Sequence, residues 1–239
     1  MRLILDEALN FDIVNHAVLR IGELEIWITD TVIATWIIMG VLIAFAVLAR
    51  IKMRKFKDVP KGFQNAVEMI VETFDGYVRS AAGEKLAFLG YWFFTVFLFV
   101  LFSNISGVLF VNAIRPPTAD WSMTFALAFV TIVLIHVMGA KYRGAKYLKS
   151  FFEPYPFLFP LNLIGEIAKP ISLSFRLFGN ILSGLIIMAL VYGITPFFAR
   201  FGIPAALHVY FDLFAGILQT YVFVTLGLTF ISEAAAIEN

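Results

Sequence analysis

Long apolar runs recur along the whole of this 239-residue chain. Five stretches contain no Asp, Glu, Lys or Arg, and they cover residues 31–49, 88–114, 121–140, 177–199 and 213–232. Each is near or above the roughly 18 residues that a helix needs to cross a bilayer. The pattern predicts an all-α membrane protein with about five membrane-crossing helices, the first three of them over 31–49, 88–112 and 121–140.

A different periodicity separates the first two runs. Between residues 61 and 82, apolar residues recur at helical spacing, and charged residues occupy the other faces. A helix of this kind lies in the membrane interface, and we expect it on the cytoplasmic side. After the third run, Pro154, Pro156 and Pro160 prevent one straight helix, because proline interrupts the helical hydrogen bonds.

The last two apolar runs are longer than a bilayer requires. Residues 170–199 and 204–232, as helices, extend about 45 Å and 43 Å at 1.5 Å per residue. The hydrocarbon core is only about 30 Å thick, so both helices should be tilted. A stretch rich in turn formers joins them. The sequence therefore predicts a long, tilted helical hairpin over residues 163–232.

Charge is distributed unevenly along the chain, although the net charge is only +1. Residues 50–61 hold six Lys or Arg against one Asp, and residues 141–149 add four more with no acid. The first thirty residues carry two basic and six acidic side chains. The positive-inside bias therefore predicts an external segment over 1–30, cytoplasmic basic loops and a cytoplasmic C-terminus. We read residues 1–239 as a single polytopic membrane domain.

The amino-acid composition excludes several classes of protein and several kinds of chemical site. The chain is 61% hydrophobic and 15% charged, whereas a soluble domain is about a quarter charged. It has no cysteine, which excludes disulfides and thiol ligands. No metal cluster, Ser–His pair or catalytic carboxylate pair is evident, so we expect neither an enzyme nor a cofactor. Nothing in the charge pattern indicates nucleic acid.

The predicted hairpin carries polar residues at helical spacing. On its first helix, five of them follow at steps of three or four and share one face: Lys169, Ser172, Arg176, Asn180 and Ser183. On its second helix, three share a face: His208, Asp212 and Gln219. Ionisable residues inside a membrane are costly. Two such polar faces therefore suggest an ion path or a seam against a partner.

Structural interpretations of these residues stay open at this point. Arg176 is also compatible with an ion pair that only holds the bundle together, with Asp212 as its partner. Asn180 and Gln219 are compatible with ordinary interhelical hydrogen bonds. His136 stands alone in the third run and fits a packed bundle residue better than a proton relay.

Four short stretches resemble the a subunit of F-type ATP synthases. In chain order they are "VPKGFQNAVE" (59–68), "PPTADWSMTFALA" (116–128), "KPISLSFRLFGNILSG" (169–184) and "GILQTYVFVTL" (216–226). The resemblance implies an ion-translocating stator subunit that catalyses no reaction itself, with ATP chemistry in the F1 sector. It also implies a ring of c subunits, a b-subunit peripheral stalk and the F1 sector as partners. The implied location is the plasma (inner) membrane of a bacterium.

The same resemblance implies a role for individual residues. In that family, two half-channels reach the carboxylates of the c ring from opposite sides of the membrane. Arg176 matches the arginine that separates these half-channels and drives ion release. Asn180 and Gln219 would flank it. The other residues expected on the ion path are the outer Asp212, the cytoplasmic Glu166, and Ser183 and His208.

This chain departs from the family at two positions. Many members carry Glu or His where this chain has Leu185, and some carry Asp in the region of Ser106. The outer half-channel therefore has few titratable groups, and both proton and sodium stay open as the coupling ion. Two other functions also stay open: a secondary transporter or channel acting alone, and a passive membrane anchor of a complex. The first is disfavoured by the lack of an internal repeat.

Overall fold

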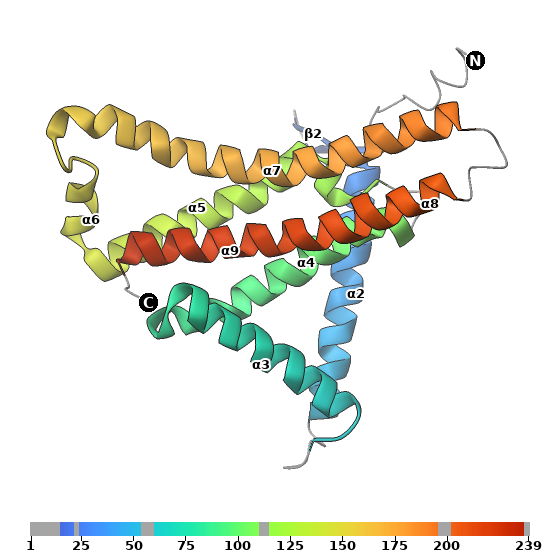
Figure 1. The fold of residues 1–239 in the computed structure, drawn as a ribbon, viewed down its shortest axis with the longest axis horizontal. Helices are drawn as coiled ribbons and strands as arrows, with labels where there is room; N and C mark the ends of the chain where they lie inside the picture. Colours follow the sequence, from blue (N-terminus) through green and yellow to red (C-terminus); the bar gives the residue numbers. More distant parts are fainter. Residues whose placement is uncertain (1–14, 22–23, 54–59, 110–114, 196–201, 237–239) are drawn as a thin grey trace. The chain divides into compact units, whose positions relative to one another are not determined.

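The computed structural model describes residues 15–21, 24–53, 60–109, 115–195 and 202–236. Five helical segments in this part of the chain are long and apolar enough to cross a membrane. Their main helices, which Figure 1 draws from blue to red, are α2 (Asp30–Met53), α4 (Gly90–Leu109), α5 (Trp121–Arg143), α7 (Phe159–Ile194) and α9 (Gly216–Ala235). The protein is an all-α membrane protein, as the apolar runs predict.

Shorter elements connect these helices. The amphipathic stretch forms α3 (Phe63–Ala82), in which Val78 and Ala82 are buried while Met69 and Ile70 are exposed. The remaining short elements are η1 (Glu84–Leu89), η2 (Pro117–Ala119), α6 (Ala145–Ser150), η3 (Pro156–Leu158), α8 (Ile203–His208) and the π-helical η5 (Val209–Ala215).

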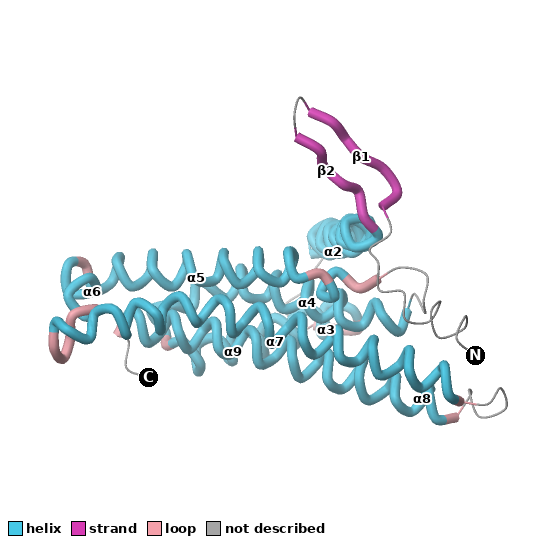
Figure 2. Tube along the Cα trace, turned by 90° about the horizontal axis from the view of Figure 1, so that it is seen from above, coloured by secondary structure: helices cyan, strands magenta, loops and turns pink. Residues whose placement is uncertain are grey.

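A small β-hairpin precedes α2, which the sequence analysis did not anticipate. Strands β1 (Asn15–Ile21) and β2 (Leu24–Thr29) pair antiparallel, and they are the magenta segments of Figure 2. The pair Arg20 and Glu25 forms an ion pair at 2.9 Å. Three apolar residues follow one another in each strand, at positions 17–19 in β1 and 26–28 in β2, so the sequence lacks the alternation with period two that marks a half-buried strand.

Packing divides the described residues into two compact units. One draws on residues up to Met39, on Phe99–Thr124 and on Ser174–Tyr221. The other draws on Gly40–Leu98, on Phe125–Leu173 and on the residues from Val222 onward. Each of the five long helices is therefore divided, with one part in the first unit and the other part in the second. Arg176 and the polar residues after it belong to the first unit, and Glu166 belongs to the second.

In the first unit, the second half of α7 runs antiparallel to α8 and to the start of α9 (Figure 1). The two arms approach closely at Gly184, where an added Cβ would lie 3.4 Å from the Cβ of Phe211. Small residues permit such close approach between membrane helices. This is the helical hairpin that the sequence predicts.

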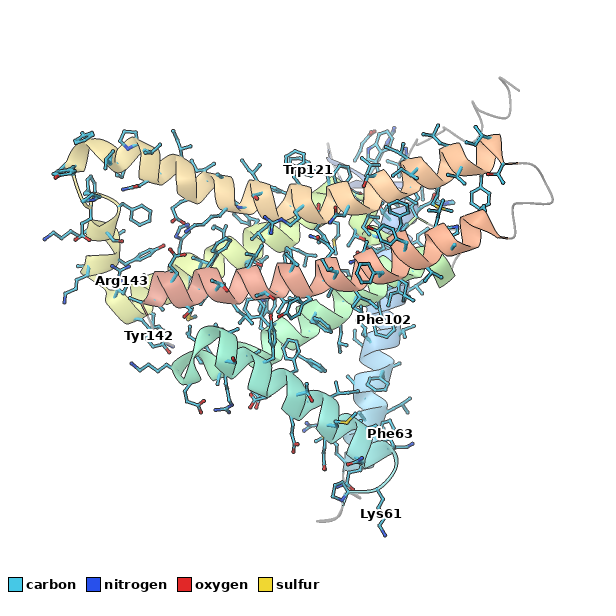
Figure 3. All side chains as sticks on the ribbon, viewed as in Figure 1. Lys61, Phe63, Phe102, Trp121, Tyr142 and Arg143 are labelled. Carbon is cyan, nitrogen blue, oxygen red and sulfur yellow. The ribbon has the colours of Figure 1, made fainter. Side chains whose placement is uncertain are left out.

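In the second unit, α3 packs on the first part of α4 and the last part of α9. Phe74 meets Phe94 edge to face, with ring centroids 5.1 Å apart, and the hydroxyl of Tyr77 lies 2.5 Å from that of Thr225. Phe93 is fully buried against Gly227, where an added Cβ would lie 2.9 Å from its ring. Figure 3 shows the side chains on these elements, with Phe63 at the start of α3.

Two details of the hairpin differ from the expected pair of uniform helices. The first helix starts at Phe159 and continues through Pro170, which lacks the N–H that would bond the carbonyl of Glu166. The second arm changes to π-helical geometry over Val209–Ala215. A π-helical turn shifts the register of one helix face relative to the next, and such turns are frequent at functional sites.

Candidate functional site

Arg176 lies on a face of α7 that the described residues leave uncovered. Its side chain is exposed, as are those of Ser172, Asn180 and Ser183, whereas Leu177 is fully buried. No ion pair among the described residues includes Arg176. The guanidinium is always charged, and a charge in the bilayer costs at least about 2.5 kcal/mol on insertion scales. No described side chain supplies the opposite charge.

Asp212 is the residue that the sequence analysis weighed as a structural partner for Arg176. Its backbone lies in the π-helical segment η5, within the first unit. Its side chain falls outside the part of the structure that is described. Its expected place on the ion path therefore stays a prediction.

Asn180 and Gln219 join the two arms of the hairpin. The amide Nδ2 of Asn180 donates to Oε1 of Gln219 at 2.6 Å. Gln219 is only 2% exposed, and its buried Nε2 finds no acceptor among the described residues. An unsatisfied buried donor costs about 1–3 kcal/mol. The open donor points to an acceptor such as a bound water molecule.

A buried polar cluster centres on Asn104, and the sequence analysis missed it. Nδ2 of Asn104 donates to the carbonyl of Gly216 at 3.0 Å and to the hydroxyl of Thr220 at 3.1 Å. Its Oδ1 accepts from the hydroxyl of Thr118 at 2.8 Å. Ser103 nearby has a buried hydroxyl without a partner among the described residues. The available signal was the polar run "SNISG" inside an apolar span.

The positions where this chain departs from the family that it resembles also lie in the first unit. Ser106 is buried, and its hydroxyl donates to the carbonyl of Ser103 at 2.7 Å. Leu185 is half-buried on α7. The cluster is therefore built from hydroxyl and amide groups rather than carboxylates in the described residues.

His208 also bridges the two arms. Its Nε2 lies 3.1 Å from the hydroxyl of Tyr192, and the two rings have centroids 5.9 Å apart. Both side chains are half-buried. The structure thus directs His208 and Gln219, which the sequence placed on one face, toward the first helix of the hairpin.

Glu166 belongs to the second unit. Nζ of Lys169 donates to its Oε1 at 2.6 Å, and the other oxygen, Oε2, is buried and accepts no hydrogen bond from the described residues. The carboxylate lines a cavity of about 390 Å³ together with Arg143, Tyr147 and Glu233. An open carboxylate oxygen in a polar cavity is able to hold a water molecule, a proton or a cation.

Tyr147 forms one wall of this cavity. Its hydroxyl lies 2.6 Å from Nδ1 of His136, so His136 has the bundle partner that the sequence analysis expected. Burial raises the pKa of Tyr147 above its usual value, and the negative charge of Glu166 raises it further, although Arg143 lowers it. The phenol therefore stays neutral and keeps its proton as a hydrogen-bond donor.

Replacing Gly139 with alanine should destabilise this wall. The added Cβ would lie 2.6 Å from the ring of Tyr147, which must then shift against its bond to His136. We expect a loss of about 1 kcal/mol in the free energy of unfolding, typical of overpacking. Gly40→Ala is the matched control, because its Cβ meets nothing within 4 Å. Equal thermal stability of the two purified variants in detergent would contradict this packing.

Comparison with known proteins identifies relatives along nearly the whole chain. The family model described as the ATP synthase A chain matches residues 32–232. The ATP synthase subunit a of Moorella thermoacetica is 36% identical over 217 residues, which are 90% of this chain and 94% of that protein. The sodium-ion-specific ATP synthase subunit a of Propionigenium modestum is 37% identical over 227 residues, which are 85% of this chain and 73% of that protein.

The match agrees with the structure in two respects. It reaches into all five apolar helices, and it includes the part of the hairpin that carries Arg176, Asn180 and Gln219. Multiple membrane-crossing helices and relatives of this kind define a multi-pass membrane protein. The chain therefore belongs to the ATP synthase A chain family, the ion-translocating membrane subunit of the F0 complex.

Proposed function

We propose that this chain is the ion-conducting stator subunit of a rotary F-type ATP synthase, with Arg176 as the barrier between two half-channels. The observation that carries the proposal is the position of Arg176. It is exposed on a membrane helix, on the polar stripe formed by Ser172, Arg176, Asn180 and Ser183. It has no ion pair among the described residues. A fixed cation in that place suits a partner that presents carboxylates one after another, as a ring of c subunits does.

The chemistry of Arg176 follows from its permanent charge. A nearby cation favours the ionised form of a carboxylate over its neutral form. A c-subunit carboxylate that arrives at Arg176 therefore gives up its ion, and the guanidinium blocks direct passage between the half-channels. Each charge that crosses the membrane releases about 2.3 kcal/mol per 100 mV. That energy turns the ring only if the ion does not leak past Arg176.

The other ion-path residues serve this barrier. The hydrogen bond between Asn180 and Gln219 fixes the polar face of α7 relative to α9. Asp212 and His208 line the outer half-channel, and Glu166 serves the cytoplasmic side. The N-terminus lies outside and the C-terminus in the cytoplasm, in one polytopic domain that contacts the c ring, the b-subunit stalk and, through the complex, F1.

Cysteine cross-linking tests which face of α7 meets the c ring. The chain has no native cysteine, so single substitutions are specific probes. Ser183 is exposed on the stripe, whereas Ser174 is fully buried and its hydroxyl lies 3.3 Å from that of Thr124. We expect Ser183→Cys, coupled to a short photo-activated reagent, to cross-link to a c subunit, and Ser174→Cys to give no such product. Equal yields from both would place the c ring elsewhere.

The coupling ion is either proton or sodium, and one experiment separates them. A relative that is 37% identical is sodium-ion specific, which makes sodium the first ion to test. ATP-driven ²²Na⁺ uptake is measured in inverted membrane vesicles in the presence of a proton uncoupler. Uptake that persists or rises identifies sodium as the coupling ion. Uptake that collapses, with ATP-driven acidification in the absence of uncoupler, identifies protons and makes Asp212 the leading relay.

A further inference from the structure

The cavity beside Glu166 is built from several separate parts of the second unit. Arg143 comes from the end of α5, Tyr147 from α6, Glu166 from the first part of α7 and Glu233 from the end of α9. Figure 3 labels Arg143 at the end of α5. The volume of about 390 Å³ has room for about a dozen waters at roughly 30 Å³ each.

The charges around this cavity favour a cation. Three carboxylates line it against two basic side chains: Glu153, Glu166 and Glu233 against Arg143 and Lys169. Lys169 is already engaged with one oxygen of Glu166. The buried second oxygen has no partner among the described residues, and buried polar atoms of this kind are usually satisfied by water or an ion.

The walls are held in place by their own hydrogen bonds. Nδ2 of Asn162 donates to the carbonyls of Phe151 at 2.8 Å and Glu153 at 3.1 Å, which fixes the loop between α6 and α7. Tyr147 is held by His136 at the other side. These hydrogen bonds hold the loop after α6 and the ring of Tyr147 in place as walls of the cavity.

We propose that this cavity is the cytoplasmic mouth of the ion path, and that Glu233 is a further ion-path residue that works beside Glu166. The inference rests on the proposed function and deepens it. The cavity borders the basic loop 141–149, which the positive-inside rule places in the cytoplasm. Its excess of carboxylates attracts hydronium or sodium ions from the cytoplasm and holds them, hydrated, next to the open oxygen of Glu166.

Thiol access tests whether the cavity is on the path. Gly165 lines it, and a Cβ at Gly165 meets nothing within 4 Å, so Gly165→Cys fits without strain. Its neighbour Ile164 is 63% exposed and does not line the cavity, which makes Ile164→Cys the control. A membrane-impermeant cationic methanethiosulfonate reagent is added to inverted vesicles, whose outer face is cytoplasmic.

We expect the reagent to label Gly165→Cys and to lower its ATP-driven ion pumping about tenfold, the usual scale for loss of electrostatic focusing. Pumping by the Ile164→Cys control should not change. Two results would overturn the inference. One is that the reagent labels Gly165→Cys and pumping does not fall; the other is that the reagent fails to label Gly165→Cys in a complex that pumps normally. Neither result would contradict the proposed role of Arg176, which substitutions of Arg176 test separately.

Glu233→Gln separates ion collection from a structural role. We expect it to raise the cytoplasmic Na⁺ or H⁺ concentration that half-saturates pumping by about three- to tenfold, with little change in the maximal rate. Glu233→Asp should restore most of the wild-type value. A lower yield of assembled complex with an unchanged half-saturating concentration in Glu233→Gln would mean that Glu233 is only structural, and would overturn its assignment.

Discussion

Replacing Arg176 with alanine is expected to lower ATP-driven ion pumping by at least about a hundredfold, the scale of losing a preorganised electrostatic group. Without the guanidinium, nothing favours the ionised form of an arriving carboxylate, so the ion is not released. Because Arg176 is exposed and has no ion pair among the described residues, its removal leaves no packing defect. Pumping is measured per assembled complex in inverted vesicles.

Two further variants sharpen this result. Arg176→Lys should recover little activity, because a desolvated ammonium loses its proton readily whereas guanidinium does not. Ile171→Ala removes another exposed side chain of α7 and should pump within a few-fold of the wild type. Full pumping by Arg176→Ala would support the passive-anchor interpretation instead.

Asn104→Ala is expected to cause the largest loss of stability. The substitution removes three hydrogen bonds, to Gly216, Thr220 and Thr118. At about 0.6–1 kcal/mol for each interhelical bond, the free energy of unfolding should fall by about 2–3 kcal/mol. The hydroxyl of Thr118 is fully buried and would lose its acceptor. Unfolding of the purified subunit in detergent measures the effect.

Thr118→Val provides the comparison for this cluster. It removes one of the three bonds and keeps the side-chain volume, so we expect a loss of only about 1 kcal/mol. A double variant with both changes should be less destabilised than the sum of the two, because the residues share a bond. Additive losses would show that Asn104 and Thr118 do not interact.

The helices were predictable because membrane insertion requires long apolar runs, and such runs are visible in sequence. The β-hairpin formed by Asn15–Ile21 and Leu24–Thr29 was not predictable from hydrophobic periodicity, because each strand contains three consecutive apolar residues instead of an alternation. The π-helical segment Val209–Ala215 was not predictable, since a one-residue change in helical hydrogen bonding leaves no signature in composition. Pro170 inside α7 suggested a helix start where the helix in fact continues.

The candidate site was only partly predictable for a related reason. Helical spacing places Arg176 and Asn180 on one face, but it does not say whether that face is buried. The structure answers this, because Arg176 and Asn180 are exposed while Leu177 is buried. The Asn104 cluster joins side chains more than a hundred positions apart, and a single sequence carries no signal for such pairs.

The most direct test of the central claim is the decay of an imposed gradient of the coupling ion across vesicles that contain the Arg176→Ala complex. If Arg176 is the barrier between the half-channels, the gradient should decay faster than with the wild-type complex, and no ATP should be made. Decay at the wild-type rate, at equal levels of assembled complex, would contradict a barrier at Arg176.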